Sequence, residues 1–559
     1  MFERVARAVA EAELIFGPAS NARLWEERFC EMMSSLDFLP NSPALMNAGT
    51  QLGQLSACFV LPIEDTLESI FQALRNMALI QRTGGGTGFA FSHLRAKGDL
   101  LASSGGRSSG PVSFMKIFDS ATENIKLGGR RRGANMAVLR IDHPDIEEFI
   151  DSKRSGQASL SNFNLSVGVT DAFMAAFQSA GQLQLRDARG RPTRSLPARD
   201  VFHRICERAW ETGDPGMVFL DTINRANPTP ADGMIESTNP CGEVPLLPYE
   251  SCTLGSINLT HFVAPGTTEP KMDWAQLRQT VHDGIRFLDD VVTVNHYPFA
   301  EIRRATEERR KVGLGVMGFA EACILREISY NSKEAISFAE ELMQIISSEA
   351  RRASTALAEE RGTFPGSSRG RAKASGQKLR NATQLSIAPT GTISLIAGTS
   401  PGVEPLFALA YQRVRVLDGQ RLVELNPVFA RYLETNGRAQ KIIESVEQTG
   451  SLEGVPEVPF EARRLFLTAL EVPPEQHVRV QAAFQKYVDN AVSKTVNLPA
   501  GASVEQIANV YALAHKLGCK GITVYRYGSK TDQVLRLGTE EEPYEREYFT
   551  RCDPDDCRL

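Results

Sequence analysis

Short apolar runs alternate with longer amphipathic segments along most of the chain. The short runs are rich in residues that favour strands, whereas the longer segments repeat their apolar positions every three to four residues, as helices do. The predicted strands include 58–61, 136–141, 165–169 and 521–525. The predicted helices include 66–79, 145–153, 274–292 and 333–358. This alternation favours an α/β architecture with parallel strands.

The two ends of the chain differ from this central region. Residues 2–35 carry apolar positions at helical spacing, which predicts one or two helices interrupted near Gly17-Pro18. The last residues are mostly charged, contain two prolines and have few core-forming side chains, which is typical of a mobile tail. We therefore divide the chain into a helical segment (1–38), a large α/β region (39–535) and a tail (536–559).

Composition narrows the classes of function. The 559 residues are 42% hydrophobic and 23% charged, as in ordinary globular proteins, and the net charge of −5 disfavours a general grip on nucleic acid. No run of about 18 apolar residues predicts a membrane span, and charges interrupt the N-terminus too often for a signal peptide. We expect a cytoplasmic protein. Its nine cysteines, an odd number spread over the chain, argue against a disulfide scaffold.

The most informative motif is Ser-Thr-Asn-Pro-Cys-Gly-Glu-Val-Pro at 237–245. Its prolines exclude a regular helix. In an extended segment Asn239, Cys241 and Glu243 would share one face. An amide, a thiol and a carboxylate placed together can orient a hydroxyl group, attack its carbon atom and take its proton. The alternative is a polar turn with a buried cysteine.

Four other cysteines stand in two kinds of context. Cys58 and Cys252 each begin a short β-prone run, so both could lie at strand ends, although each one taken alone favours a core cysteine. Cys552 and Cys557 lie in the acidic tail. A zinc site there would need about four ligands, and no histidine lies nearby. A dithiol that carries electrons fits a tether better.

Taken together, these cysteines and the Asn-Pro-Cys-Gly-Glu motif resemble the active-site set of ribonucleotide reductases. Further segments extend the resemblance in the expected order, at 39–49, 82–88, 213–219, 388–394 and 521–529. The resemblance implies a ten-stranded α/β barrel, made of two parallel five-stranded halves, with a central finger loop that carries Cys241. A buried loop of this kind would shield a radical from solvent.

The resemblance also implies roles for the polar residues. Cys241 becomes a thiyl radical that removes the 3′ hydrogen of the ribose, Glu243 takes the proton of the 3′ hydroxyl, and Asn239 holds that hydroxyl. Cys58 and Cys252 deliver two electrons as the 2′ hydroxyl leaves as water, and they end as a disulfide.

The tail cysteines have an implied role of their own. Cys552 and Cys557 re-reduce that disulfide and are themselves reduced by a thioredoxin-like partner.

Nucleotide sites follow from the same resemblance. Residues 388–394 would bind the substrate phosphates, although an ordinary Thr/Gly turn is the alternative. The basic loop 128–135 alone could contact any anion or RNA, but it matches a loop that links a bound deoxynucleoside triphosphate effector to the substrate base. The implied substrate-binding residues are Ser42, Ala57, Cys58, Gly86, Asn239, Pro240, Cys241, Gly242, Glu243, Pro389, Thr390, Gly391, Thr392 and Ile393. The implied effector-binding residues are Asp65, Arg95, Arg130, Arg131 and Arg132, and the arginine run leaves the register of the last three open.

Three branches of the family differ in their radical source. A branch with a partner subunit passes the radical along adjacent tyrosines, whereas here Arg526 separates Tyr525 from Tyr527. The glycyl-radical branch needs a C-terminal glycine motif that this tail lacks. The remaining branch uses adenosylcobalamin, which need not be ligated by a protein histidine. We therefore expect adenosylcobalamin as the cofactor and no metal site built from protein ligands.

Three competing functions remain. One is a reductase that depends on a separate metal-radical subunit, and another is a non-catalytic nucleotide-binding regulator on the same barrel. The third is an NAD-dependent dehydrogenase, suggested only by Gly313, Gly315 and Gly318 in a G-x-G-x-x-G pattern. The stretch before it is polar and helix-prone rather than a strand, so we interpret these glycines as close packing of a turn or helix.

Family tendencies supply the last expectations. They favour ribonucleoside diphosphates as substrates and a homodimer as the assembly. Only about 38 residues precede the first matching motif, so we expect no N-terminal ATP-binding domain that regulates overall activity.

Overall fold

The computed structural model describes residues 1–100, 105–127, 131–154, 160–264, 271–371, 376–416, 420–436 and 439–529. Its centre is a barrel of nine named strands and the short bridging segment 385–387. Five consecutive neighbours in the first half of the ring are parallel to one another. They are β2 (Cys58–Leu61), β3 (Gly86–Ala90), β6 (Asn135–Arg140), β7 (Phe163–Val169) and β10 (Gly216–Phe219).

The second half of the ring is also parallel. β13 pairs with β14, the short segment 385–387 bridges β14 to Val492, and β17 continues from there to pair with β18. The named strands of this half are β13 (Ser251–Asn258), β14 (Val312–Met317), β17 (Thr495–Leu498) and β18 (Gly521–Arg526).

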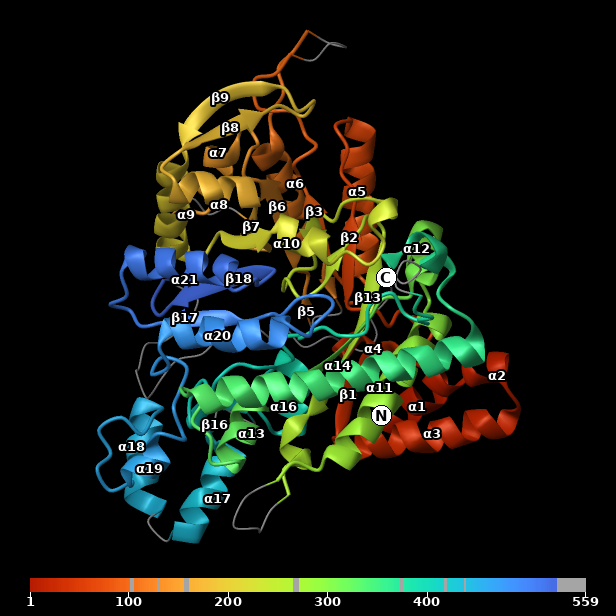
Figure 1. Cartoon of the computed structure of the whole chain (residues 1–559), viewed down its shortest axis with the longest axis vertical. Coiled ribbons are helices and arrows are strands. Elements are labelled where there is room, and N and C mark those ends of the chain that lie inside the picture. The colour runs from red at the N-terminus through yellow and green to blue at the C-terminus, as the bar shows by residue number, and fades with distance from the viewer. Residues whose placement is uncertain are drawn as a thin grey trace.

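Two antiparallel junctions join the halves. β13 lies against β2 with Cys252 opposite Cys58, and β10 lies against β18 with Met217 opposite Ile522. The ring is therefore closed, which confirms the expected ten-stranded barrel of two parallel halves. Because parallel neighbours need long crossover connections, the helices of both halves cover the outside of the ring (Figure 1). An additional strand, β1 (Phe38–Pro40), pairs antiparallel with β13.

The finger loop enters the barrel as a hairpin of β11 (Ser237–Thr238) and β12 (Pro245–Leu246). The Asn164 side chain on β7 donates to the Pro240 carbonyl at 2.8 Å, so the first half of the barrel holds one side of the hairpin. From the second half, the Ser386 hydroxyl donates to the Glu243 carbonyl at 2.9 Å. A Cβ atom at Gly88 would lie 1.8 Å from the Thr238 carbonyl oxygen, so only glycine lets the hairpin approach β3 this closely.

Three of the predicted helices are confirmed within a few residues: α5 (Leu67–Gln81), α11 (Trp274–Val294) and α14 (Lys333–Arg361). The fourth, α7 (Ile146–Ile150), is shorter than predicted. The remaining helices are α4 (Ser42–Asn47), α6 (Pro111–Asn124), α8 (Asp171–Gln178), α9 (Ala198–Thr212), α10 (Leu220–Arg225), α12 (Ala300–Arg309), α13 (Phe319–Leu325), α16 (Gly391–Ala397), α17 (Pro427–Asn436), α18 (Ala439–Thr449), α19 (Phe460–Arg463), α20 (Pro474–Gln485) and α21 (Val504–Lys516). Three further hairpins are β4–β5 (Lys126–Leu127, Arg131–Arg132), β8–β9 (Gln182–Arg186, Pro192–Pro197) and β15–β16 (Ala410–Val416, Gln420–Leu425).

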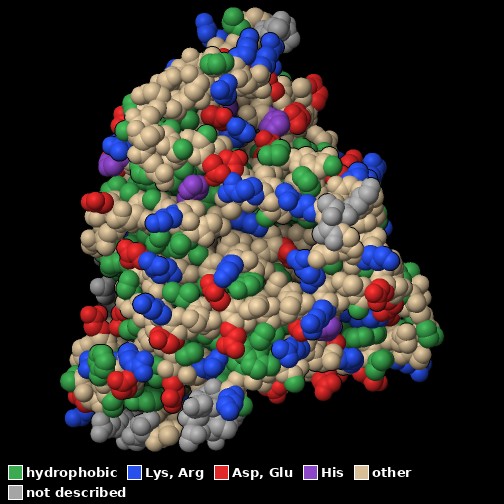
Figure 2. Space-filling model, viewed as in Figure 1, with side chains coloured by type: hydrophobic (Ala, Val, Ile, Leu, Met, Phe, Trp, Pro, Cys, Tyr) green, Lys and Arg blue, Asp and Glu red, His purple; other side chains and the backbone are tan. Residues whose placement is uncertain are grey.

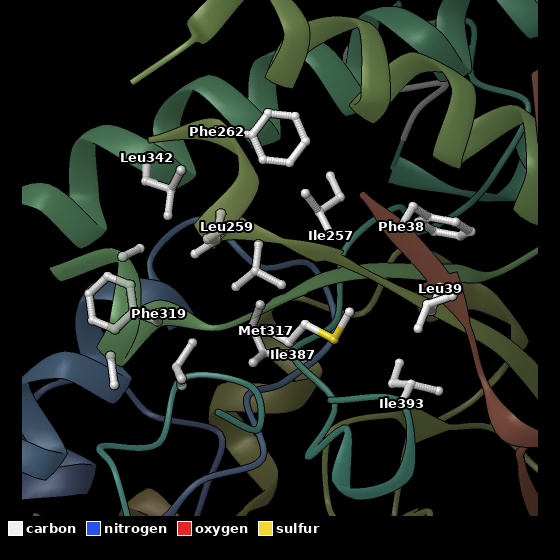
Figure 3. Packing of buried hydrophobic residues seen from close by; sticks show 14 of the residues in the cluster. Phe38, Leu39, Ile257, Leu259, Phe262, Met317, Phe319, Leu342, Ile387 and Ile393 are labelled. Atoms are coloured by element: carbon white, nitrogen blue, oxygen red, sulfur yellow. The ribbon is translucent and has the colours of Figure 1, made fainter. Parts of the chain in front are cut away.

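The N-terminal segment contains three helices rather than the expected one or two: α1 (Phe2–Ala10), α2 (Glu13–Phe16) and α3 (Ala19–Ser34). The additional break, at residues 11–12, is followed by Glu13, whose side chain is directed inward and is only 1% exposed. Of these helices, α1 and α3 pack against α11, and α3 also packs against β1, within a large apolar cluster that includes Phe38, Ile257 and Ile387 (Figure 3). The cluster joins the N-terminal helices to the second half of the barrel.

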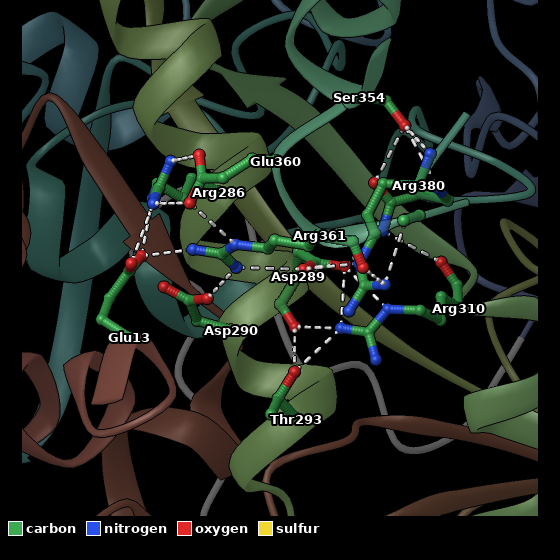
Figure 4. Close-up of polar contacts among 12 residues, drawn as sticks. Glu13, Arg286, Asp289, Asp290, Thr293, Arg310, Ser354, Glu360, Arg361 and Arg380 are labelled. Carbon is green, nitrogen blue, oxygen red and sulfur yellow. Dashed lines mark hydrogen bonds and ion pairs between the residues drawn. The ribbon is translucent and has the colours of Figure 1, made fainter. Parts of the chain in front are cut away.

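A buried network of charges reinforces this junction (Figure 4). Glu13 binds Arg286 on α11 at 2.6 Å and Arg361 at the end of α14. Arg361 also contacts Asp289 at 3.2 Å, and Asp289 in turn binds Arg310 at 2.8 Å, just before β14. The guanidinium groups lower the pKa of the Asp289 carboxyl and oppose the effect of its burial. The network therefore connects α2 to both long helices and to the barrel.

We expect Glu13→Ala to lower the free energy of unfolding by about 3 kcal/mol, because it leaves two buried arginine side chains without one of their carboxylate partners. Urea unfolding followed by circular dichroism measures the effect. The control is Glu360→Ala, which removes a half-exposed partner of the same Arg286 and should cost less than about 1 kcal/mol. Equal losses in the two variants would contradict the expectation.

The molecular surface shows acidic and basic side chains interspersed over the face drawn in Figure 2. That face offers no broad basic surface of the kind that binds nucleic-acid backbones. Among the described helices, none is both long enough and apolar enough to cross a membrane.

Candidate active site

The Asn-Pro-Cys-Gly-Glu motif forms a tight turn at the tip of the hairpin. Gly242 has a φ of +82°, and its N–H donates to the Asn239 carbonyl at 3.1 Å. The expectation of an extended segment is therefore wrong at this point, because the hairpin must reverse direction within a few residues. The turn nevertheless brings Asn239, Cys241 and Glu243 to the wall of one cavity.

This first cavity has a volume of about 320 Å³ and lies between the finger loop, α4, β2, β3 and the loop that leads into α16. It collects almost all of the substrate-binding residues that the sequence suggested. The expected residues that line it are Ser42, Ala57, Cys58, Gly86, Asn239, Pro240, Cys241, Glu243, Pro389, Thr390, Gly391, Thr392 and Ile393. Gly242 does not line it.

Cys58 and Cys252 lie directly opposite each other on antiparallel strands. Residues in this relation have Cα atoms roughly 4.5–5.5 Å apart, which is within the range that a disulfide requires. Both are free thiols, and burial strongly raises the pKa of each. Cys58 lines the cavity, whereas Cys252 is fully buried behind it. The structure therefore provides a dithiol with one sulfur at the cavity and one in the wall.

Asn239 connects the finger loop to this dithiol. Its side-chain Nδ2 donates to Cys58 Sγ at 3.0 Å, and its side-chain Oδ1 accepts from the Val244 N–H at 2.9 Å. Both ends of the amide are therefore used, which fixes its orientation at the cavity wall.

Glu243 is 2% exposed, and burial raises the pKa of its carboxyl to about 7. The Asn239 side chain acts in the opposite direction but does not compensate. One carboxyl oxygen, Oε2, has no hydrogen-bond partner among the described residues. A carboxyl group with such a pKa, facing a cavity, is suited to accept a proton near neutral pH.

We expect Glu243→Gln to make the protein more stable than the wild type above pH 7. The folded protein holds the proton of Glu243 up to about pH 7, whereas the unfolded chain releases it near pH 4.5, so the wild type loses stability as the pH rises through this window. The variant has no such proton and should gain about 3 kcal/mol relative to the wild type between about pH 4 and about pH 8. Urea unfolding at both pH values tests this, with the exposed Glu453→Gln as control. A difference between variant and wild type that does not change with pH would refute it.

Three polar residues of the first cavity were not predicted from the sequence: Asn41, Gln81 and Ser256. Each has a buried polar atom with no hydrogen-bond partner in the described part of the chain: Asn41 Nδ2, Gln81 Oε1 and Ser256 Oγ. Buried polar atoms are normally satisfied, so these three atoms leave unused hydrogen-bonding capacity among the residues of the cavity wall. Asn41 lies within the segment 39–49 and Gln81 adjoins the segment 82–88, both of which the resemblance singled out, whereas Ser256 has no signal in the sequence.

A second cavity, of about 530 Å³, lies on the inside of the barrel between both halves. It shares Pro240, Cys241 and Pro389 with the first cavity, and Gly242 lines it as well. Cys241 therefore stands where the two cavities meet. Its side chain is exposed, in contrast with those of Asn239 and Glu243, so the expectation of a fully buried loop holds for the neighbours of the thiol but not for the thiol itself.

The expected effector residues are placed only in part. Arg95 binds Asp65 through Nε at 2.7 Å and through its backbone N–H at 3.1 Å. Arg130 lies outside the described residues, as do Cys552 and Cys557. Arg131 and Arg132 form β5, and their side chains are not described.

The G-x-G-x-x-G pattern is not a dinucleotide loop. Gly313 and Gly315 lie inside β14 itself, and a Cβ atom at Gly315 would come within 2.3 Å of the Ser386 carbonyl oxygen. The pattern reflects close packing, as expected, but of a barrel strand rather than of a turn or helix.

Comparison with protein families agrees with the geometry. The family model "Ribonucleotide reductase, barrel domain" matches residues 56–375 and 368–525, and the model "Ribonucleotide reductase, all-alpha domain" matches residues 1–53.

Individual relatives agree as well. A vitamin B12-dependent ribonucleoside-diphosphate reductase of Mycobacterium tuberculosis is 52% identical over 96% of this chain and 76% of its own length. One of Thermoplasma acidophilum is 53% identical over 93% of this chain and 68% of its own length. The solved structure of the Actinobacillus ureae class Id ribonucleotide reductase alpha subunit superposes with a TM-score of 0.78, covering 94% of this chain and 93% of that one. At 24% identity, this last similarity concerns the fold alone.

Proposed function

Because this chain belongs to the ribonucleotide reductase family, we propose that it reduces ribonucleoside diphosphates to 2′-deoxyribonucleotides by a thiyl-radical mechanism that depends on adenosylcobalamin. The observation that carries the proposal is the position of Cys241 between two cavities. The first cavity is also lined by Asn239, Glu243 and Cys58, whereas the described residues that line the second cavity include neither Cys58 nor Cys252.

The first cavity takes the substrate. Its unpartnered polar atoms suit the hydroxyls of a ribose, and the loop of Pro389–Ile393 supplies hydroxyl and N–H groups for the phosphates. The Thr390 hydroxyl accepts a hydrogen bond from the Gly402 N–H at 2.7 Å, which holds this loop in shape. The relatives that are half identical to this chain are named as diphosphate reductases, which supports diphosphates rather than triphosphates.

Each of the polar side chains at the first cavity then acts in one step of the reaction. The Cys241 thiyl removes the 3′ hydrogen of the ribose, and Glu243, whose pKa of about 7 suits a general base, takes the proton of the 3′ hydroxyl. Asn239 orients that hydroxyl. The Cys58–Cys252 dithiol supplies two electrons as the 2′ hydroxyl leaves as water, and the two sulfurs join as a disulfide.

The second cavity fits the adenosyl part of the cofactor. Its volume is within the usual range of small-ligand sites, and Asn164, Ser166, Asn497 and Thr523 contribute polar side chains to its wall. When bound, adenosylcobalamin supplies the radical that arises at Cys241. The relatives named above are called vitamin B12-dependent, which supports this cofactor.

Effector nucleotides and a second subunit complete the proposal. Asp65 and Arg95 mark an effector site, completed by the arginines of 130–132. Next to it, α5 and α6 carry three exposed apolar side chains, Leu67, Phe71 and Ile117. Two adjoining helices with exposed apolar residues are suited to pack against a second copy, so a homodimer would bury them beside the effector site.

The supply of electrons completes the cycle. We assign Cys552 and Cys557 to carry electrons from a thioredoxin-like protein to Cys58 and Cys252. We place the enzyme in the cytoplasm, where such dithiol reductants keep thiols reduced.

The test is direct. Purified protein is incubated with dithiothreitol and each ribonucleoside di- or triphosphate, with and without adenosylcobalamin, and deoxynucleotides are measured. We expect product only when adenosylcobalamin is present, and faster product formation from diphosphates. Product that requires a separate metal-radical subunit would favour that branch of the family instead, and no product under either condition would favour a regulator.

A further inference from the structure

A buried ion pair stands beside the redox-active cysteines and has no part in the mechanism described above. Lys311 Nζ binds Glu250 Oε2 at 2.7 Å, and the two side chains are 2% and 1% exposed. Lys311 immediately precedes β14, whose Val312 is the partner of Thr253 on β13. Glu250 is two residues before Cys252. The ammonium group is thus held next to the strand position that carries Cys252.

The two sulfurs of the dithiol meet different surroundings. Charged groups that act on Cys252 are Lys311, which favours its thiolate, and Glu243 and Glu250, which oppose it, with Lys311 having the largest effect of the three. Arg309 lies 3.3 Å from the second carboxyl oxygen of Glu250 and offsets part of its charge. Cys58 is influenced by Glu243 and by the neighbouring thiols, all of which oppose its thiolate, and only the Asn239 amide favours it.

Cys58 is the more accessible of the two sulfurs, although its thiolate is the less stabilised. Cys58 lines the first cavity, whereas Cys252 has no exposed surface. In thiol–disulfide exchange, the accessible sulfur is attacked, and the sulfur whose thiolate is better stabilised leaves faster. In the Cys58–Cys252 disulfide both criteria assign attack to Cys58 and departure to Cys252.

We propose that Lys311, held in place by Glu250, is a positioning residue for re-reduction of the active-site disulfide, and that it stabilises the Cys252 thiolate expelled when an incoming thiolate attacks Cys58. This proposal rests on the function proposed above, in which Cys58 and Cys252 form a disulfide at each turnover.

The exchange balances in two steps. A thiolate of the reductant forms a bond to Cys58 Sγ, the Cys58–Cys252 bond breaks, and Cys252 leaves with the electron pair. The second thiol of the reductant, as thiolate, then attacks the reductant sulfur of the mixed disulfide and releases Cys58. The dithiol becomes a disulfide, and its two electrons and two protons end on Cys58 and Cys252.

The experiment follows the exchange alone, without nucleotide or cofactor. Full-length protein carrying Cys552→Ser and Cys557→Ser, so that the tail cannot intervene, is oxidised with diamide until the Cys58–Cys252 disulfide has formed. It is then treated with the monothiol β-mercaptoethanol. Samples are quenched in acid and alkylated, and the adduct is located and quantified by peptide mass spectrometry.

We expect the adduct on Cys58, forming roughly tenfold more slowly in Lys311→Met because the leaving thiolate loses its counter-charge. Glu250→Gln should not slow the reaction, since the amide oxygen of the new side chain can still accept a hydrogen bond from the Lys311 ammonium group while the charge that opposes the thiolate is removed. Lys153→Met is the matched control: it breaks a partly buried ion pair with Asp214 in the other half of the barrel, and the rate should not change.

Two results would overturn the proposal. One is an adduct on Cys252 in the protein with Lys311 intact. The other is an equal loss of rate in Lys311→Met and Glu250→Gln, which a purely structural ion pair predicts. If Lys311→Met does not fold, the proposal is still tested by the cysteine on which the adduct forms and by whether Glu250→Gln slows adduct formation. Failure to form deoxynucleotides would reject the proposed reaction but would leave the exchange rates as they are, so the two failures are distinguishable.

Discussion

Cys241→Ser should abolish deoxynucleotide formation, with a loss of activity on the order of 10⁴-fold or more. The substitution removes the thiol that abstracts the 3′ hydrogen, and all later steps depend on that abstraction. A serine O–H bond is too strong to yield a radical that abstracts the 3′ hydrogen and then returns it. Measuring product per enzyme under saturating substrate, cofactor and dithiothreitol tests this.

The fold of this variant should remain intact. Cys241 is exposed at the tip of the hairpin, and the replacement changes one atom without leaving a core cavity. Thermal unfolding should therefore match the wild type. Cys30→Ser, which changes a half-buried thiol on α3, is the matched control and should keep full activity. Activity of the Cys241 variant within a hundredfold of the wild type would show that the thiol is not the radical site.

The double change Cys552→Ser with Cys557→Ser should block multiple turnovers driven by thioredoxin, with a loss of about a hundredfold or more. The physical reason is access: Cys58 is 3% exposed and Cys252 is not exposed at all, so a folded protein reductant cannot reach their disulfide. The first turnover of pre-reduced enzyme should be spared, because the dithiol in the barrel already holds two electrons.

Small reductants and the barrel cysteines provide the controls for this second result. Dithiothreitol is small enough to enter the first cavity and should restore part of the activity of the tail variant. It should not rescue Cys58→Ser or Cys252→Ser, in which the reductant at the substrate itself is missing. If the tail variant turns over normally with thioredoxin, a structural or metal-binding role for its two cysteines should be considered again.

Local patterns were sufficient where the structure depends on local preferences. The apolar run 58–61 is β2, and the spacing over 274–292 and 333–358 found α11 and α14 nearly to their ends. Local reasoning failed where a longer-range contact intervened. The break before Glu13 directs that side chain to Arg286 and Arg361, which lie hundreds of residues further along the chain. The motif at 239–243 is a turn because its two flanking strands pair with each other.

The sequence by itself determined the α/β class, the family and most members of the first cavity, because residue order and motif chemistry are properties of the chain alone. Only the tertiary structure decided that Cys58 lies opposite Cys252, that Cys241 stands between two cavities, and that Lys311 lies next to the strand position of Cys252. It also decided that Glu243 has a pKa near 7, since that value arises from burial by distant segments. Closure of the barrel brings these residues together, and neither the distances nor the dielectric surroundings that result are present in any local stretch of the chain.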